Sequence, residues 1–183
     1  MAFKFIKEIS NILINKSSSR AGFTLVETLV SLVILSFGLI PTLSVIVSSV
    51  NISRIVRNNL ISAGLTQEGI EVIRSLRDAN WFRSSPNFHD GLIGTWRVDW
   101  NTNWTTNLLQ AVTPETNPFI NFDPATGLYT YTSGFPTIFK RLVTVSLTAN
   151  TCNCELVVIS EVTWSDFHRT RTIRAESHLF NWR

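Results

Sequence analysis

Histidine, cysteine and carboxylate side chains are the residues that could carry chemistry in this chain, and their spacing does not bring them together. The sequence has no HExxH motif and no glycine-rich phosphate loop. Its three histidines fall in separate predicted elements, and we interpret each as a structural or surface residue: His89, His168 and His178. These patterns predict no catalytic site, no metal site and no cofactor.

Two further features could be mistaken for metal sites. Residues 123–127 (Asp-Pro-Ala-Thr-Gly) offer one carboxylate, whereas calcium takes about six to eight oxygen ligands, so this stretch is predicted to be a turn. Cys152 and Cys154 are the only cysteines, and no further ligand lies at zinc spacing. A disulfide between them stays an open alternative for a protein outside the cytoplasm, although the i, i+2 geometry is tight.

One carboxylate stands at the edge of a strongly apolar segment. Glu27 is followed by an uncharged run from Thr28 to Ser53, which as a helix extends about 39 Å at roughly 1.5 Å per residue. That length spans a bilayer core of about 30 Å. An ionisable group inside a membrane helix costs about 2.5–3.5 kcal/mol on insertion scales, so Glu27 needs a compensating partner.

Two ordinary explanations of the apolar run are incomplete. A secretory signal peptide has a short apolar region, then a cleavage site of the A-x-A type, and is removed; this run is longer and no such site follows it. A single-pass anchor accounts for the length but gives no reason for Glu27. The junction in front of the run, a basic leader followed by Gly22 and Phe23, sets the segment apart from both.

This junction resembles the class III signal of type IV prepilins and pseudopilins. The matching residues are Gly22, Phe23, Thr24, Leu25, Glu27 and Leu29. The resemblance implies that a membrane-embedded prepilin peptidase cuts after Gly22 and N-methylates Phe23, while the apolar helix stays in the mature protein. Phe23 and Glu27 are spaced i, i+4, one helical turn apart. Glu27 can therefore meet the new α-amine of its own chain or that of a neighbouring subunit, and the family implies the second, during assembly.

The resemblance implies a structural role and no enzymatic activity. The partners it implies are the prepilin peptidase, other pilin or pseudopilin subunits, membrane lipid, and the platform protein and ATPase of an assembly machine. Residues 67–81 are similar to PilV-like minor pilins and GspI-type pseudopilins, which favours a minor subunit. A type IV pilus, a type II secretion pseudopilus and a DNA-uptake filament all stay open. The alternative function is a filament-tip module that binds a surface, DNA or a secreted substrate through residues 101–127.

Charge is concentrated before the apolar run. The chain has a formal net charge of +3, and the leader supplies all of it, so the remainder is neutral. The charged residues of the leader are Lys4, Lys7, Glu8, Lys16 and Arg20. The basic balance therefore gives no indication of nucleic-acid binding. The positive-inside rule predicts a single pass through the inner membrane with the N-terminus in the cytoplasm and the C-terminal domain outside, before transfer into a pilus or pseudopilus.

The predicted fold class is α+β and type IV pilin-like, with one long N-terminal helix packed against a C-terminal antiparallel sheet. Apolar residues recur at spacings of three and four after the uncharged run, so one helix is expected from about Thr24 to about Asp78. Alternating or turn-bounded segments predict strands at 95–100, 128–132, 139–149, 155–164 and 170–179. The expected divisions are leader 1–22, hydrophobic helix 23–53, amphipathic continuation 54–80, and β domain 81–183 with a variable loop at 101–127.

Two positions within these elements carry open questions. Gly38 and Pro41 interrupt the apolar helix, and Pro41 cannot donate to the carbonyl of Phe37, which predicts a kink or a loosened turn at 37–41. Membrane helices also tolerate proline where neighbouring groups satisfy the backbone, and both interpretations stay open. The tryptophans fit core packing, with Trp104, inside the polar loop, as the one to test for exposure.

Overall fold

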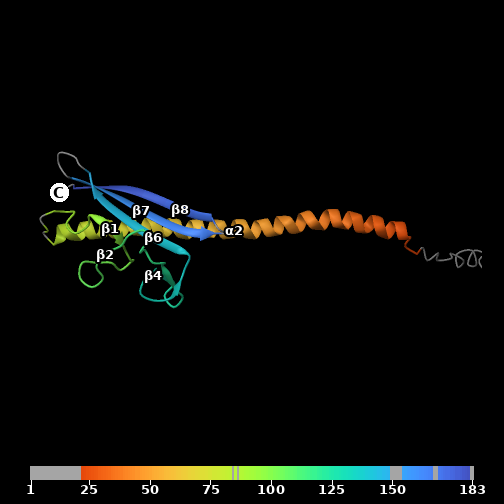
Figure 1. Cartoon of the computed structure of the whole chain (residues 1–183), viewed down its shortest axis with the longest axis horizontal. Coiled ribbons are helices and arrows are strands. Elements are labelled where there is room, and N and C mark those ends of the chain that lie inside the picture. Colours follow the sequence, from red (N-terminus) through yellow and green to blue (C-terminus); the bar gives the residue numbers. More distant parts are fainter. Residues whose placement is uncertain (1–21, 84, 86, 149–153, 167–168, 182–183) are drawn as a thin grey trace, which may run out of the picture. The chain divides into compact units, whose positions relative to one another are not determined.

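The computed structural model of the chain describes residues 22–83, 85, 87–148, 154–166 and 169–181 (Figure 1). It divides into two units, the first ending at Asn51 and the second beginning at Ile52. The first unit holds the apolar part of a long helix. The second holds the rest of that helix and the eight strands found among the described residues.

The long helix α2 extends over Leu25–Phe82. The amide of Arg83 still donates to the carbonyl of Ala79 at 3.0 Å, after which the chain leaves the helix. Pro86 follows in the sequence, and the residue before a proline is disfavoured from helical conformation. The prediction of one uninterrupted helix is confirmed, with an end one turn later than expected.

The strands form two antiparallel sheets. The larger sheet has the order β2-β1-β6-β7-β8 and the smaller has the order β4-β3-β5. The strand bounds are β1 Gly94–Arg97, β2 Gln110–Ala111, β3 Asn121–Asp123, β4 Leu128–Thr130, β5 Phe135–Pro136, β6 Phe139–Leu147, β7 Glu155–Asp166 and β8 Arg169–Phe180. The helix followed by an antiparallel sheet confirms the predicted α+β, type IV pilin-like layout.

The expectation of a single sheet and an irregular 101–127 loop is wrong in two details. That loop contains β2, which pairs with β1, and β3, which pairs with β4 and β5. The strand expected at 128–132 therefore belongs to the smaller sheet, as β4. Strands of two or three residues are too short for an alternating pattern to show, and only their pairing partners stabilise them.

The strand expected at 95–100 ends early because of an inward-turning carboxylate. Asp99 was expected on the polar side of the alternation, but it is buried, and Trp100 is exposed. The Asp99 carboxylate accepts hydrogen bonds from the Thr130 hydroxyl at 2.7 Å and from the Tyr131 amide at 3.2 Å. A buried carboxylate needs hydrogen-bond donors of this kind. Because Asp99 turns inward to reach them, the backbone pairing of β1 ends after Arg97.

The core of the second unit lies between α2 and the inward faces of β6 and β7. Alternate residues of both strands are buried, and the helix contributes residues at spacings of three and four. The buried apolar residues of the main cluster are Ile70, Val72, Ile73, Leu76, Phe88, Leu92, Val98, Val143, Val145, Leu156, Val158 and Leu179. Each buried aliphatic side chain contributes about 1.5–3 kcal/mol relative to exposure, so this contact dominates the stability of the unit.

Helix and sheet approach closely at Gly69. A Cβ placed there would lie 2.5 Å from Oγ of Ser160 and 3.0 Å from Cγ2 of Val143. Glycine in a helix interior usually costs about 0.5–1 kcal/mol relative to alanine. Here its missing side chain is what lets α2 lie against the middle of the sheet.

Candidate processing and assembly site

The segment that the sequence singles out is the start of α2, where Thr24 caps the helix. Its hydroxyl accepts a hydrogen bond from the amide of Glu27 at 3.2 Å, and its carbonyl accepts one from the amide of Thr28 at 3.1 Å. A threonine followed three residues later by glutamate is the pattern of a helix N-terminal capping box. Gly22 and Phe23 precede this cap, so they lie outside the helix, and both residues are exposed.

Gly22 is not required by the fold of the described residues. A Cβ added there meets nothing within 4 Å, and its backbone is not left-handed. Glycine at this position therefore satisfies no packing or conformational need that the described residues impose.

Glu27 occupies the first turn of α2 with an exposed carboxylate. No described residue lies within hydrogen-bonding distance of that carboxylate. The partial positive charge of the helix N-terminus favours an anion there, but the effect is about 0.3–1 kcal/mol at exposed sites. Because the helix begins after Thr24, Phe23 precedes the cap, so the one-turn pairing of positions 23 and 27 stays a prediction for the processed chain.

The apolar half of α2 exposes nearly every side chain. All residues from Gly22 to Val50 are exposed except Ser31, which is half-buried. This is the one helix in the described part of the chain that is long and apolar enough to cross a membrane. A continuous apolar surface of this length is unfavourable in water, so lipid or other helices must cover it.

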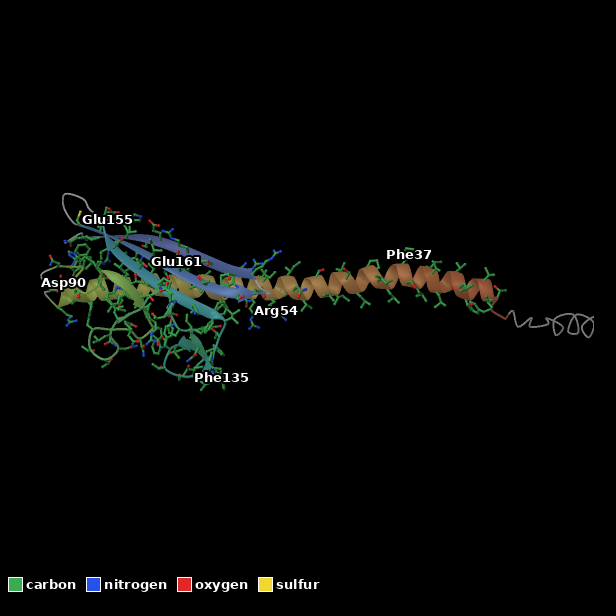
Figure 2. The ribbon with its side chains drawn as sticks, in the orientation of Figure 1. Phe37, Arg54, Asp90, Phe135, Glu155 and Glu161 are labelled. Atoms are coloured by element: carbon green, nitrogen blue, oxygen red, sulfur yellow. The ribbon has the colours of Figure 1, made fainter. Side chains whose placement is uncertain are left out.

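Gly38 and Pro41 lie within this half of α2, and the helix is assigned without a break through both (Figure 2, which labels Phe37). The hydroxyl of Thr42 donates to the carbonyl of Gly38 at 2.7 Å. Pro41 has no N–H, so the carbonyl of Phe37 lacks its helical donor. An open space of about 260 Å³ lies beside Phe37 and Pro41. The loosened turn stays a prediction.

Replacing Pro41 by alanine is expected to slow amide hydrogen exchange at residues 37–41 in micelles by about fivefold or more. The alanine amide restores one hydrogen bond to Phe37, and such a bond contributes about 1 kcal/mol. Leu39→Ala, at an exposed position with an amide in both forms, is the control and should leave exchange unchanged. Equal exchange in the parent and Pro41→Ala forms would show that the turn is not loosened.

The other predicted features do not converge on a chemical site. Asp123 closes the turn between β3 and β4, where its carbonyl accepts from the Gly127 amide at 2.8 Å. Hydrogen bonds from the Ser133 hydroxyl and the Ala125 amide hold the pKa of Asp123 below its ordinary value. Among the described residues, no three His, Cys, Asp or Glu side chains gather where they could hold a metal ion.

Of the histidines and cysteines, the structure describes His89, His178 and Cys154. His178, on β8, contacts Glu155 at 2.6 Å, a hydrogen bond that raises the pKa of the imidazole. His89 lies in the loop after α2, and His168 lies outside the described residues. Cys152 also lies outside them, so its disulfide with Cys154 stays a prediction.

Trp104, the tryptophan singled out for a test of exposure, is not fully exposed. It is half-buried against the main core cluster, and its indole N–H donates to the carbonyl of Leu76 in α2 at 3.1 Å. Its ring lies 3.0 Å from the Cβ position of Gly91, whose φ of 72° is open to glycine. The side chain of Trp104 therefore holds the loop that contains it against α2.

Sequence reasoning missed a buried arginine that joins three elements. Arg141, on β6, is 0% exposed. Its guanidinium donates to the Glu68 carboxylate at 2.8 Å, to the Leu65 carbonyl at 3.1 Å and to the Val98 carbonyl at 2.6 Å. A signal was present, because Arg141 falls in phase with the inward apolar positions of its strand.

The family model for the prokaryotic N-terminal methylation motif matches residues 17–43, which include the capped start of α2 and run through Pro41. No curated protein and no solved structure matched the chain. The chain therefore carries, at the head of a pilin-like α+β fold, the N-terminal methylation motif and class III signal that are typical of type IV pilins and pseudopilins.

Proposed function

We propose that the protein is the precursor of a structural subunit, of the minor class, in a type IV pilus or a related secretion or DNA-uptake filament. The observation that carries this proposal is the methylation motif, which coincides with a helix start that leaves Gly22 and Phe23 outside the helix. A protease needs its scissile peptide bond in an accessible, non-helical segment, and the Thr24 cap provides one. The minor class is favoured by the similarity of residues 67–81 to minor pilins and pseudopilins.

Processing follows from the same segment. Prepilin peptidase cuts after Gly22 and methylates the α-amine of Phe23, and the absence of any internal need for glycine at position 22 supports its recognition by that enzyme. The proposed leader is then 1–22. The segment 23–53 remains as the membrane and assembly helix, 54–80 continues it, and 81–183 forms the β domain.

The membrane arrangement follows from charge and from the exposed apolar surface of α2. The leader carries the positive charge and stays in the cytoplasm, while the β domain lies outside the inner membrane. Lipid covers the apolar half of α2 until helices of other subunits replace it in the filament. The platform protein and ATPase of the assembly machine drive the transfer of the subunit from the membrane into the filament.

Mass spectrometry of filament or membrane material is expected to show an N-terminus at Phe23 that carries one methyl group. Gly22→Val, which places a branched side chain at the cut, should accumulate the uncut precursor with at least about a hundredfold less product, as expected for loss of a few kcal/mol of transition-state binding.

Gly38→Ala is the matched control, because a Cβ at Gly38 also meets nothing within 4 Å. This variant should be cut and methylated as the parent is. An intact Met1 terminus on mature material, or equal cleavage of Gly22→Val, would contradict the proposal.

A further inference from the structure

A groove of about 570 Å³ opens in the second unit between α2 and the smaller sheet. Its helical wall is formed by Arg57, Asn58 and Ile61. The strand side is formed by Phe122, Tyr129 and residues 135–139. Arg57 is the only charged residue among the described residues that line it, so the groove is apolar with one cationic edge.

The rim of the groove exposes aromatic and aliphatic side chains. Phe135 is 72% exposed, Ile138 43% and Phe122 37%. Figure 2 shows Phe135 at the outer edge of the strands, projecting away from α2. Gly134 makes this presentation possible: its φ is 89°, and a Cβ there would lie 2.3 Å from the carbonyl oxygen of Phe122. The tight turn thus places Phe135 opposite Phe122 in the ladder, with its ring in solvent.

Charge at this end of the second unit favours an anionic partner. Arg57 also borders a neighbouring space of about 320 Å³ with Arg54 and Asp166. Asp166 is buried and pairs in the ladder with Arg169, which is exposed. Among the described residues that border these two spaces, the exposed charges are therefore those of Arg54 and Arg57.

The position of the groove along α2 identifies the partner. Arg57 and Asn58 follow Ser53, the last residue of the uncharged run, by about one helical turn, which is roughly 6 Å of rise. Aromatic side chains beside arginine are the composition that settles at a membrane interface, and anionic headgroups attract arginine within a Debye length. If the groove instead bound a second copy of this chain, it would have no need to lie one helical turn from the end of the membrane-spanning run.

We propose that this groove docks on the surface of the membrane that α2 spans, with Phe135 inserted among the headgroups and Arg57 bound to anionic lipid phosphate. The inference rests on the membrane-spanning role in the proposed function. It adds that the β domain is held on the bilayer before the subunit is drawn into a filament. Docking also shields Phe135, Ile138 and Phe122 from water in that state.

Photocrosslinking tests the docking with the full chain. Phe135→p-benzoylphenylalanine is reconstituted into vesicles of phosphatidylethanolamine and phosphatidylglycerol, irradiated and analysed by mass spectrometry. The expected product is a lipid adduct at position 135. The same substitution at Phe180 is the matched control, because Phe180 is 52% exposed and its carbonyl accepts from Arg77 at 3.4 Å. Arg77 lies about 30 Å further along α2 than Arg57, so position 180 should give no lipid adduct.

The competing outcomes are distinct. A crosslinked dimer, no adduct, or equal lipid adducts at positions 135 and 180 would overturn the docking proposal. Extraction by alkaline carbonate, measured on the same vesicles, tests the membrane-spanning role separately from the docking. Protein that is retained without a lipid adduct contradicts the docking alone, whereas protein that is extracted contradicts the membrane-spanning role and the docking together.

The charge contribution is tested with Arg57→Gln. One arginine near an anionic surface strengthens association by about fivefold, so this variant should reduce the adduct at position 135 by about that factor in phosphatidylglycerol vesicles. In pure phosphatidylcholine vesicles the parent and the variant should give equal adducts. Equal adducts in both vesicle types would show that Arg57 does not bind the headgroups.

Discussion

Replacing Glu27 by alanine is expected to exclude the subunit from filaments while leaving membrane insertion and cleavage intact. The Glu27 carboxylate has no partner among the described residues, and its proposed partner is the α-amine of Phe23 on an adjacent processed subunit. Removing one member of a buried ion pair leaves the other charge uncompensated, at about 3–5 kcal/mol. That cost corresponds to at least about a hundredfold loss of Glu27→Ala from sheared filaments, measured by immunoblot against the membrane fraction.

Two companion variants make this result specific. Glu27→Asp keeps the charge with a shorter reach and should be partly defective. Glu71→Ala removes an exposed carboxylate from the same helix, where it pairs with Arg74 at 2.5 Å, and should enter filaments normally. If Glu27→Ala enters filaments as readily as Glu71→Ala, the assembly role of Glu27 is wrong, although the processing proposal would stand.

Replacing Arg141 by alanine is expected to lower the free energy of unfolding of the second unit by at least about 3 kcal/mol. The change leaves the Leu65 and Val98 carbonyls without this donor, leaves Glu68 without its cation, and opens a cavity in the core. Urea unfolding of the full chain in micelles, followed by tryptophan fluorescence, measures the loss, because several indoles pack on this core.

An arginine on the surface of the same sheet serves as the control for that measurement. Arg174 is 51% exposed and lies near Glu161 and Glu176, and exposed ion pairs contribute about 0–1 kcal/mol. Arg174→Ala should therefore shift the urea midpoint only slightly. Similar losses for Arg141→Ala and Arg174→Ala would show that the buried network does not hold the helix to the sheet.

Long periodic elements were predictable because their patterns are carried by many residues. The helix from about Thr24 was expected from an uncharged run joined to an amphipathic one, and it is found as Leu25–Phe82. The strands β6, β7 and β8 were expected within about two residues of their observed ends. In each strand one face is less exposed than the other over nine residues or more, so local sequence and tertiary packing agree.

Short elements and buried polar groups were not predictable in this way. A strand of two residues such as β2 has no periodicity of its own, and its existence depends on Trp96 and Arg97 being opposite. The polarity of Asp99 indicated an exposed residue, but Thr130 and Tyr131, distant in sequence, supply the donors that stabilise it in the interior. The polar surroundings of Trp104 left its exposure open to test, and the hydrogen bond from its indole to the Leu76 carbonyl, distant in sequence, accounts for its half-buried position.

The amino-acid sequence by itself determined the parts of this protein whose physics is local. A charge-free run long enough for a bilayer, a threonine that caps the helix beginning there, and glycine followed by phenylalanine outside the cap all depend on neighbours within a few residues. Only the tertiary structure decided the second sheet, the guanidinium of Arg141 inside the core, and the groove between Arg57 and Phe135. Each of these features joins residues that are far apart in the chain. Such contacts are stable only when the whole unit is packed, so no pattern of neighbouring residues predicts them.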